Sequence, residues 1–283
     1  MTRLAEVERH IGGMKELLGI VSAMRSLAGM RLQEAQRAVP GMRGYAAAVA
    51  AAIVDTRSLV EDRGPAPAAA GGRRALVLCT AEHGFVGGFN ERLVDAATAR
   101  LGPHDPLFVL GSRGAAMLAE RGRSAAWTHP MPSRCSAVPE AVNRLSAELY
   151  RSIAAGDVDR VEIMYTLARP GGRDSIPCHG VLPVDTAGLS AGSPRQPPIH
   201  NLPPAVLQEK LLGEYVFAVL AEALVESIAS ENAARFRAME SARENVSGKL
   251  RDLAAEARHA RQTEITDELL DLVTGAEAVN AGN

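Results

Sequence analysis

A regular spacing of apolar residues runs through the first forty residues of the chain. Steps of three and four separate the apolar positions over five heptads, and Arg25 is the only charged member. The members of this N-terminal seam are Leu4, Val7, Ile11, Met14, Leu18, Val21, Arg25, Ala28, Leu32, Ala35 and Val39. Such spacing is typical of a helix that packs along a second helix in a coiled coil. We expect Pro40 and Gly41 to kink or interrupt this helix, after which a helical composition resumes.

The second helix is predicted at the other end of the chain. Residues 205–274 contain no proline and only two glycines, which permits one continuous helix of roughly 100 Å. Its C-terminal seam is formed by Phe236, Met239, Val246, Leu250, Leu253, Ala257 and Ala260, with a polar interruption at Arg243. We predict that the two seams pair antiparallel in a long coiled coil. The alternative is an ordinary amphipathic helix that lies on a globular core.

Between these helices the chain alternates short apolar runs with helical patterns. The predicted strands are ALVLCT, PLFVLG, SAAW, RVEIMYTLA and IPCHGVLPV, and the predicted helices between them are FNERLVDAATARL, GAAMLAERG and VPEAVNRLSAELYRSIAAG. Alternation of this kind favours a largely parallel sheet covered by helices. The fold class predicted is therefore mixed α+β and α/β, a long antiparallel coiled coil with an inserted Rossmann-like α/β domain.

Composition shifts divide the chain into four parts. Residues 1–62 form the N-terminal helix and its continuation, and residues 63–73, rich in proline, alanine and glycine, form a linker. Residues 74–203 form the α/β domain, and residues 204–283 form the C-terminal helix.

Charge and cysteine content exclude several functional classes. A net charge of −2 with only three lysines argues against a nucleic-acid binder, which needs a concentrated basic face. No apolar run is long enough to span a membrane, and the N-terminus is charged, so we expect a cytoplasmic chain. Cys79, Cys135 and Cys178 are an odd number at unrelated spacings, which indicates neither a disulfide framework nor a metal site.

One segment could carry chemistry. AEHGFVGGFN follows the first predicted strand, where a doubly wound fold would hold a phosphate at a helix N-terminus. The segment matches neither glycine-rich nucleotide motif, and it contains no lysine. We therefore assign Gly84, Gly87 and Gly88 to backbone geometry and expect no nucleotide, no cofactor and no catalytic residue here.

Three segments resemble one family, the gamma subunits of F-type ATP synthases. ASENAARFRAMESARENV followed by ARQTEITDELLDLVTGAEAV is similar to the C-terminal signature of that family. GFVGGFN resembles its GLCGGxN motif, and SAMRSLAGMRLQEAQ resembles its N-terminal helix. Gly19 and Ser22 stand where the family usually has lysines. The cysteine-bearing insert of the chloroplast version is missing, which fits a bacterial origin.

The resemblance implies a non-catalytic central shaft that couples ion flow, of protons or sodium, to ATP synthesis or hydrolysis. The implied partners are a hexamer of alpha and beta subunits, the epsilon subunit and the membrane ring of c subunits. The implied location is peripheral, at the cytoplasmic face of the inner membrane. The residues implied to contact beta subunits are Met24, Arg25 and Arg235 near the lever loop, and Arg261, Gln262, Thr266 and Glu268 near the catch region. The alternatives are a coiled-coil scaffold unrelated to rotation and a small-molecule-binding α/β protein.

Overall fold

The computed structural model describes residues 3–57, 59, 72–169, 171, 174–186, 188, 189 and 198–281. The predicted linker lies outside the described residues except for its last two, Gly72 and Arg73. By internal contacts the chain forms two compact units, Met1–Leu27 with Phe236–Asn283, and Ala28–Arg235. Each unit contains part of both long helices, whereas the sequence-based division follows changes of composition and stays a prediction.

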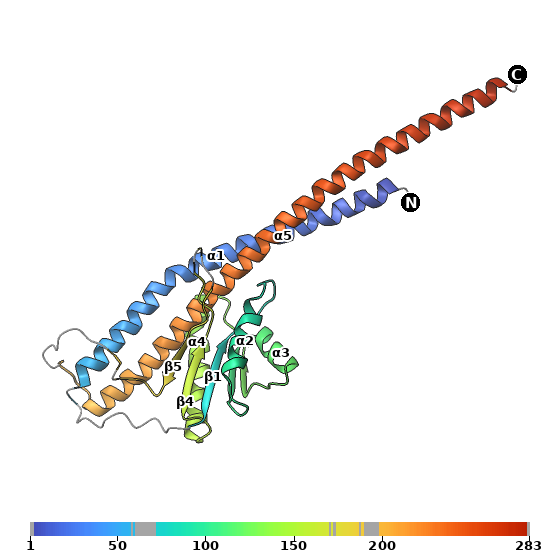
Figure 1. The fold of residues 1–283 in the computed structure, drawn as a ribbon. Coiled ribbons are helices and arrows are strands. Elements are labelled where there is room, and N and C mark those ends of the chain that lie inside the picture. Colours follow the sequence, from blue (N-terminus) through green and yellow to red (C-terminus); the bar gives the residue numbers. More distant parts are fainter. Residues whose placement is uncertain are drawn as a thin grey trace. The chain divides into compact units, whose positions relative to one another are not determined.

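The second unit contains a five-stranded sheet in the order β3-β2-β1-β4-β5 (Figure 1). The strands are β1 (Arg74–Cys79), β2 (Leu107–Leu110), β3 (Trp127–His129), β4 (Arg160–Met164) and β5 (Cys178–Leu182). β1 pairs in parallel with both β2 and β4, β2 pairs in parallel with β3, and β5 pairs antiparallel with β4. The predicted largely parallel sheet is therefore confirmed. The third predicted strand was placed about three residues early, because Trp127 rather than Ser124 is the first residue paired with β2.

The two faces of the sheet are covered by different helices. The connecting helices are α2 (Phe89–Arg100), α3 (Ser112–Glu120), the 3-10 turn η1 (Cys135–Ala137) and α4 (Val138–Ala154). Leu76 and Leu78 of β1 pack against buried residues of α2 and α3. Their neighbours in β1, Ala75, Val77 and Cys79, join the main core with α4 and parts of the two long helices. Alternate residues of a strand point to opposite faces, so β1 has to be apolar throughout.

The long helices are α1 (Arg3–Arg57) and α5 (Pro204–Ala281). We expected Pro40 and Gly41 to kink or interrupt α1; an interruption is wrong, because the helix is continuous through both residues, and a kink stays a prediction. An interior proline removes one hydrogen bond and costs about 3 kcal/mol. Buried residues on both sides of it, Ala35 and Val39 before and Ala46 after, offset that cost by packing. Pro40 itself is exposed, so its ring meets solvent rather than the core.

In the first unit, burial follows the two predicted seams. Val7 and Val21 of α1 and Met239 and Leu253 of α5 are buried, and the other seam positions there are partly covered except the exposed Arg243. Ion pairs between the helices join Arg3 to Glu256 at 3.1 Å, Glu8 to Arg261 at 2.7 Å, and Arg25 to Glu240. The partner of Arg25 comes before the partners of Arg3 and Glu8 in α5, so the two helices run antiparallel. Whether their side chains interlock as in a coiled coil stays a prediction.

Candidate functional site

The glycine-rich connection between β1 and α2 forms a tight turn over residues 84–88. Gly87 has a φ of 56°, in the left-handed region that glycine adopts without strain. This supports the assignment of that glycine to backbone geometry, whereas Gly88 has an ordinary φ of −78°. Phe85 also has a left-handed φ, of 62°, and its side chain is left 66 % exposed. A bulky residue in this conformation is strained, and sequence reasoning gave no sign of it.

The position where a phosphate would approach α3 is taken by a carboxylate of the chain itself. Glu82 accepts hydrogen bonds from the backbone N–H of Ser112 at 3.1 Å and of Met131 at 3.0 Å, and from the Ser112 hydroxyl. Burial alone would raise the pKa of Glu82, but these hydrogen bonds outweigh burial and hold the pKa below its ordinary value. An ionised carboxylate at the start of α3 repels a phosphate from that helix end.

Helix α3 also begins in close contact with the end of β1. The Thr80 hydroxyl donates to the carbonyl of Leu110 at 2.8 Å. A Cβ at Gly111 would lie 2.3 Å from the carbonyl oxygen of Thr80. A Cβ at Gly114 would lie 2.2 Å from the side chain of Thr80. Only glycine fits at both positions, so the two glycines bring α3 against the strand. This geometry leaves no room for a ligand between Thr80 and α3.

The crevice expected between β1 and β4 is filled by α5. In doubly wound folds a ligand lies at the carboxyl ends of the strands where the strand order reverses, which is here between β1 and β4. The Ser227 hydroxyl of α5 donates to the carbonyl of Cys79 at 3.2 Å. The backbone N–H of Ala168, just after β4, donates to the Ser230 hydroxyl at 2.8 Å. Both serines are buried, so the chain itself occupies the place of a ligand.

One buried cation joins α5 to the glycine-rich turn. Arg235 forms an ion pair with Glu231 at 2.6 Å, and its guanidinium also donates to the carbonyls of His83 at 3.3 Å and Gly84 at 3.4 Å. A further hydrogen bond reaches Asn232 at 3.4 Å. Burial raises the pKa of Glu231, although the charges of Arg235 and His83 act in the opposite direction. The side chain of Arg235 is only 9 % exposed.

The other residues implied to contact beta subunits lie in the first unit. Met24 and Arg25 are partly covered, and the Arg25 guanidinium lies 4.7 Å from the centre of the Phe236 ring. Arg261, Gln262, Thr266 and Glu268 are exposed on two turns of α5. Thr266 donates its hydroxyl to the backbone carbonyl of Gln262 at 2.9 Å. The structure thus groups these four residues on one helix and places Arg235 in the other unit.

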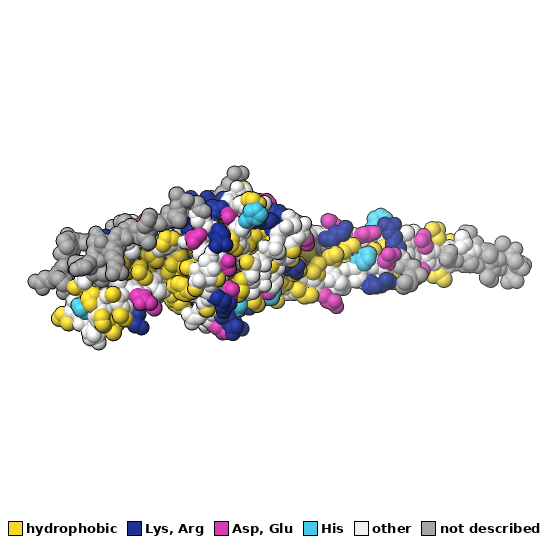
Figure 2. All heavy atoms as spheres, turned by 90° about the horizontal axis from the view of Figure 1, so that it is seen from below, with side chains coloured by type: hydrophobic (Ala, Val, Ile, Leu, Met, Phe, Trp, Pro, Cys, Tyr) yellow, Lys and Arg dark blue, Asp and Glu magenta, His cyan; other side chains and the backbone are white. Residues whose placement is uncertain are grey.

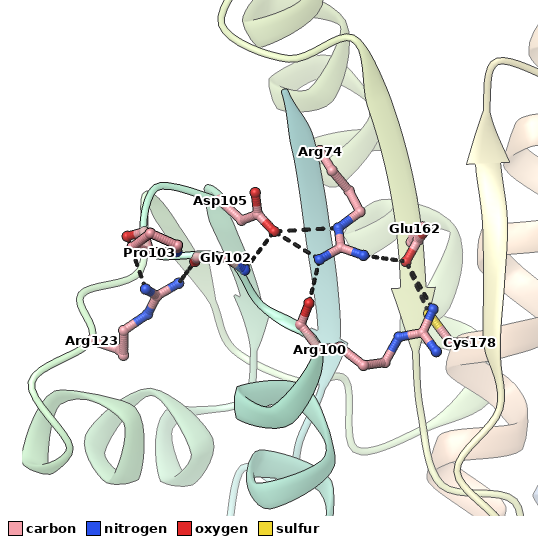
Figure 3. A network of polar contacts seen from close by, with 8 residues as sticks. All are labelled: Arg74, Arg100, Gly102, Pro103, Asp105, Arg123, Glu162 and Cys178. Carbon is pink, nitrogen blue, oxygen red and sulfur yellow. Dashed lines mark hydrogen bonds and ion pairs between the residues drawn. The ribbon is translucent and has the colours of Figure 1, made fainter. Parts of the chain in front are cut away.

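A second polar cluster stands at the amino end of the sheet (Figure 3). Arg74 pairs with Asp105 at 2.8 Å and with Glu162 at 3.7 Å, and the Cys178 thiol donates to Glu162 at 3.3 Å. Burial, reinforced by Glu162, raises the pKa of Cys178 to about 11, so this thiol is a poor nucleophile. Arg74 and Arg100 are paired with carboxylates of the chain, and Arg123 donates to the carbonyls of Gly102 and Pro103. The cluster therefore fastens the start of β1 to its neighbours.

Other kinds of site are not found in the part of the chain that the structure describes. Among those residues no group of three His, Cys, Asp or Glu side chains is placed to bind a metal ion. None of their helices is long and apolar enough to cross a membrane. Figure 2 shows acidic and basic side chains interspersed over one face, without a block of one sign.

Comparisons with known proteins cover the whole chain. Residues 3–279 match the family model described as ATP synthase. An ATP synthase gamma chain of Streptomyces avermitilis is 31 % identical over 98 % of this chain and 96 % of its own length. An ATP synthase gamma chain of a Geobacter species is 28 % identical over 99 % of both chains.

Solved structures share the fold. A chain of the Euglena gracilis mitochondrial ATP synthase has a TM-score of 0.61 with 17 % identity, over 99 % of this chain and 95 % of its own. A chain from the rotor of the same enzyme has a TM-score of 0.59 with 16 % identity, over 93 % of this chain and 98 % of its own.

Proposed function

The chain belongs to the ATP synthase gamma-chain family and is a central-stalk subunit of an F-type ATP synthase, and from this premise we propose that it is the non-catalytic shaft of the motor. In this proposal, ion flow through the membrane ring turns the shaft, and the turning shaft drives ATP synthesis on the beta subunits. The reverse direction, hydrolysis that drives ion transport, uses the same contacts. The observation that carries the proposal is the match to gamma chains over nearly the full length.

The paired helices are the mechanical part of the proposal. We assign the shaft to the seams of α1 and α5, paired as an antiparallel coiled coil, with residues 74–203 as the attached α/β domain. The antiparallel direction given by the Arg25–Glu240 pair against the Arg3–Glu256 and Glu8–Arg261 pairs, and the buried seam positions, support this assignment. A seam of interlocked side chains resists bending and sliding better than a single helix does.

The partners are assigned by family. We propose that a hexamer of alpha and beta subunits surrounds the helix pair, and that the epsilon subunit and the ring of c subunits bind the α/β part. The complex would lie at the cytoplasmic face of the inner membrane, with this chain as a peripheral subunit. The rotor structure of Euglena, which shares the fold, supports the rotor assignment.

A role without bond chemistry agrees with the filled crevice. Glu82 covers the start of α3, and Ser227 and Ser230 of α5 occupy the position of a ligand between β1 and β4. A nucleotide could enter only if α5 left the sheet, which would expose the main core. We therefore place ATP chemistry on the partner subunits.

Contacts with beta subunits are proposed for exposed polar residues of α5. Arg261 carries a rigid fork of donors, Gln262 adds a donor and an acceptor, and Thr266 and Glu268 lie on the following turns. Near the lever loop, we assign contacts to Met24 and Arg25. Only a small part of the Arg235 side chain is exposed, so a beta subunit could contact only that part.

The test is the double variant Arg261→Ala, Gln262→Ala in the complete complex. The subunit should stay folded, because the ion pair of Arg261 with Glu8 is exposed and such pairs contribute about 0 to 1 kcal/mol. Rotor contacts should be lost, so ATP turnover and recovery of the assembled complex should both fall. The matched control is Arg258→Ala, His259→Ala, an exposed pair less than one turn earlier. Normal turnover and normal assembly in the first variant would reject these contacts.

A further inference from the structure

A single side chain of α5 binds the turn that follows β1. The Arg235 guanidinium donates to two successive backbone carbonyls, of His83 and Gly84, while Glu231 on the same helix neutralises its charge. Arg235 and Gly84 are 151 residues apart in the sequence. These hydrogen bonds therefore connect two elements that the backbone does not hold together.

The arrangement is costly, which indicates that it has a role. Burying a charged pair costs several kcal/mol unless hydrogen bonds satisfy the remaining donors. Here the guanidinium obtains them from the turn and from Asn232. The turn is itself strained, since Phe85 is held in a left-handed conformation directly after the two bound carbonyls. Strain of this kind persists only where surrounding contacts fix the backbone.

The turn is rigid on its other side as well. The side-chain oxygen of Asn90, in α2, accepts a hydrogen bond from the backbone N–H of Ala81 at 2.9 Å. Val86 and Phe89 pack with Ala81 and with Ala234 of α5 in a small buried cluster. The hydrophobic effect is non-directional, whereas the hydrogen bonds of the Arg235 fork depend on the position of the turn along and around the helix. Arg235 thus adds a directional contact at the turn to the hydrogen bonds that Ser227 and Ser230 make beside β1 and β4.

We propose that Arg235 is a positioning residue that locks the glycine-rich turn, and through it the α/β domain, onto α5, so that domain and helix turn together under load. The inference rests on the proposed shaft function, since only a rotating subunit needs a joint that resists shear. Its ligands are the carbonyls of His83 and Gly84, and Glu231 supplies the neutralising charge. No contact with another subunit is needed for this role.

The variant that tests the joint is Glu231→Leu, Arg235→Met. Removing both charges avoids an unpaired buried ion, so the chain should fold, while the hydrogen bonds to the turn are lost. The control is Arg144→Met, which removes an exposed ion pair with Glu140 within one helix of the same unit. Arg235→Lys is a third variant, because lysine keeps the charge but lacks the planar fork.

Two measurements are made on the complete complex in sealed vesicles. In the double variant, hydrogen exchange of the backbone amides of residues 83–88 should be faster by about tenfold or more, while the sheet keeps its protection. The number of ions transported per ATP hydrolysed should fall several-fold, with assembly retained, and Arg235→Lys should give an intermediate value. The Arg144 control should match the unmodified chain in both measurements.

The outcomes separate the joint from the shaft function. Unchanged exchange in residues 83–88 would overturn the structural role of Arg235. Faster exchange with unchanged transport per ATP would overturn its role in turning the domain. If the unmodified chain fails to restore coupled transport to a complex that lacks this subunit, the proposed function itself fails, whatever the variants do.

Discussion

Replacing Leu253 by alanine tests whether the seam of α5 is packed against α1. Leu253 lies in the C-terminal seam and is only 6 % exposed. Leu269 lies on the same helix and is 57 % exposed. The variants Leu253→Ala and Leu269→Ala change the same atoms in the same kind of backbone. Any effect of helix propensity therefore cancels between them.

The expected loss in free energy of unfolding follows from how much of each leucine is covered. A leucine-to-alanine change removes three carbons, which is roughly 2.4 kcal/mol at about 0.8 kcal/mol for each buried carbon. Nearly all of this applies to Leu253, and the cavity left behind raises the loss to about 2.5 to 4 kcal/mol. Less than half of Leu269 is covered, so its loss should stay below about 1 kcal/mol.

The assay is thermal unfolding of the full chain, followed by far-ultraviolet circular dichroism. At about 2 to 4 °C for each kcal/mol in a chain of this size, Leu253→Ala should lower the midpoint of the transition by roughly 5 °C or more. Leu269→Ala should lower it by no more than about 4 °C. Equal shifts in the two variants would show that Leu253 gains nothing from a facing helix, and the predicted coiled coil would be refuted.

Three further predictions concern charge and ligands. Arg25→Glu should lower the free energy of unfolding of the chain, measured in urea, by about 1 to 2 kcal/mol, because it replaces an ion pair with Glu240 by a repulsion. Adding Glu240→Arg should recover about 1 kcal/mol of this loss. A double variant no more stable than Arg25→Glu alone would contradict the pairing. Burial is the largest single influence on Asp105 and would raise its pKa, but the hydrogen bonds from Arg74 and the backbone N–H of Gly102, together with the charges of Arg74 and Arg123, outweigh burial and lower the pKa. The carboxylate therefore stabilises the fold at neutral pH, and this contribution is lost as the pH falls from about 4 through the lowered pKa. Asp105→Asn should therefore lose less stability than the unmodified chain between pH 6 and pH 3 in the same assay, and an equal loss would argue against this role. Titration calorimetry of the full chain with magnesium ATP should give no binding, because α5 fills the crevice, and micromolar affinity would overturn the non-catalytic assignment.

Local sequence patterns predicted the helices and strands of this fold. The features that these patterns did not predict depend on contacts between residues distant in sequence. The seam spacing correctly marked Val7, Val21 and Leu253 as covered positions, because a period of three and four places them on one face of a helix. The interruption at Pro40 was predicted wrongly, since the packing that offsets the proline comes from residues distant in sequence.

The candidate site was predictable only in part. The turn geometry at Gly87 follows from its residue type, and the absence of a nucleotide motif was visible in the sequence. The burial of Arg235 against the carbonyls of residues 83 and 84 was not visible, because backbone carbonyls leave no mark in a sequence. The strain at Phe85 was not visible either, because phenylalanine gives no sign in a sequence of a left-handed conformation.

The filling of the crevice by α5 has a consequence for synthesis on the ribosome. Cys79 ends the first strand, and Ser227, which covers its carbonyl, is made 148 residues later. At about 5 to 20 residues per second, the carboxyl end of the sheet is made roughly 7 to 30 s before the helix that covers it. During that interval the apolar face of β1, with Val77 and Cys79, lacks its partners from α5. The nascent chain therefore exposes apolar surface until its last third has been synthesised. Its yield in the cell should depend on chaperones that bind exposed apolar surface.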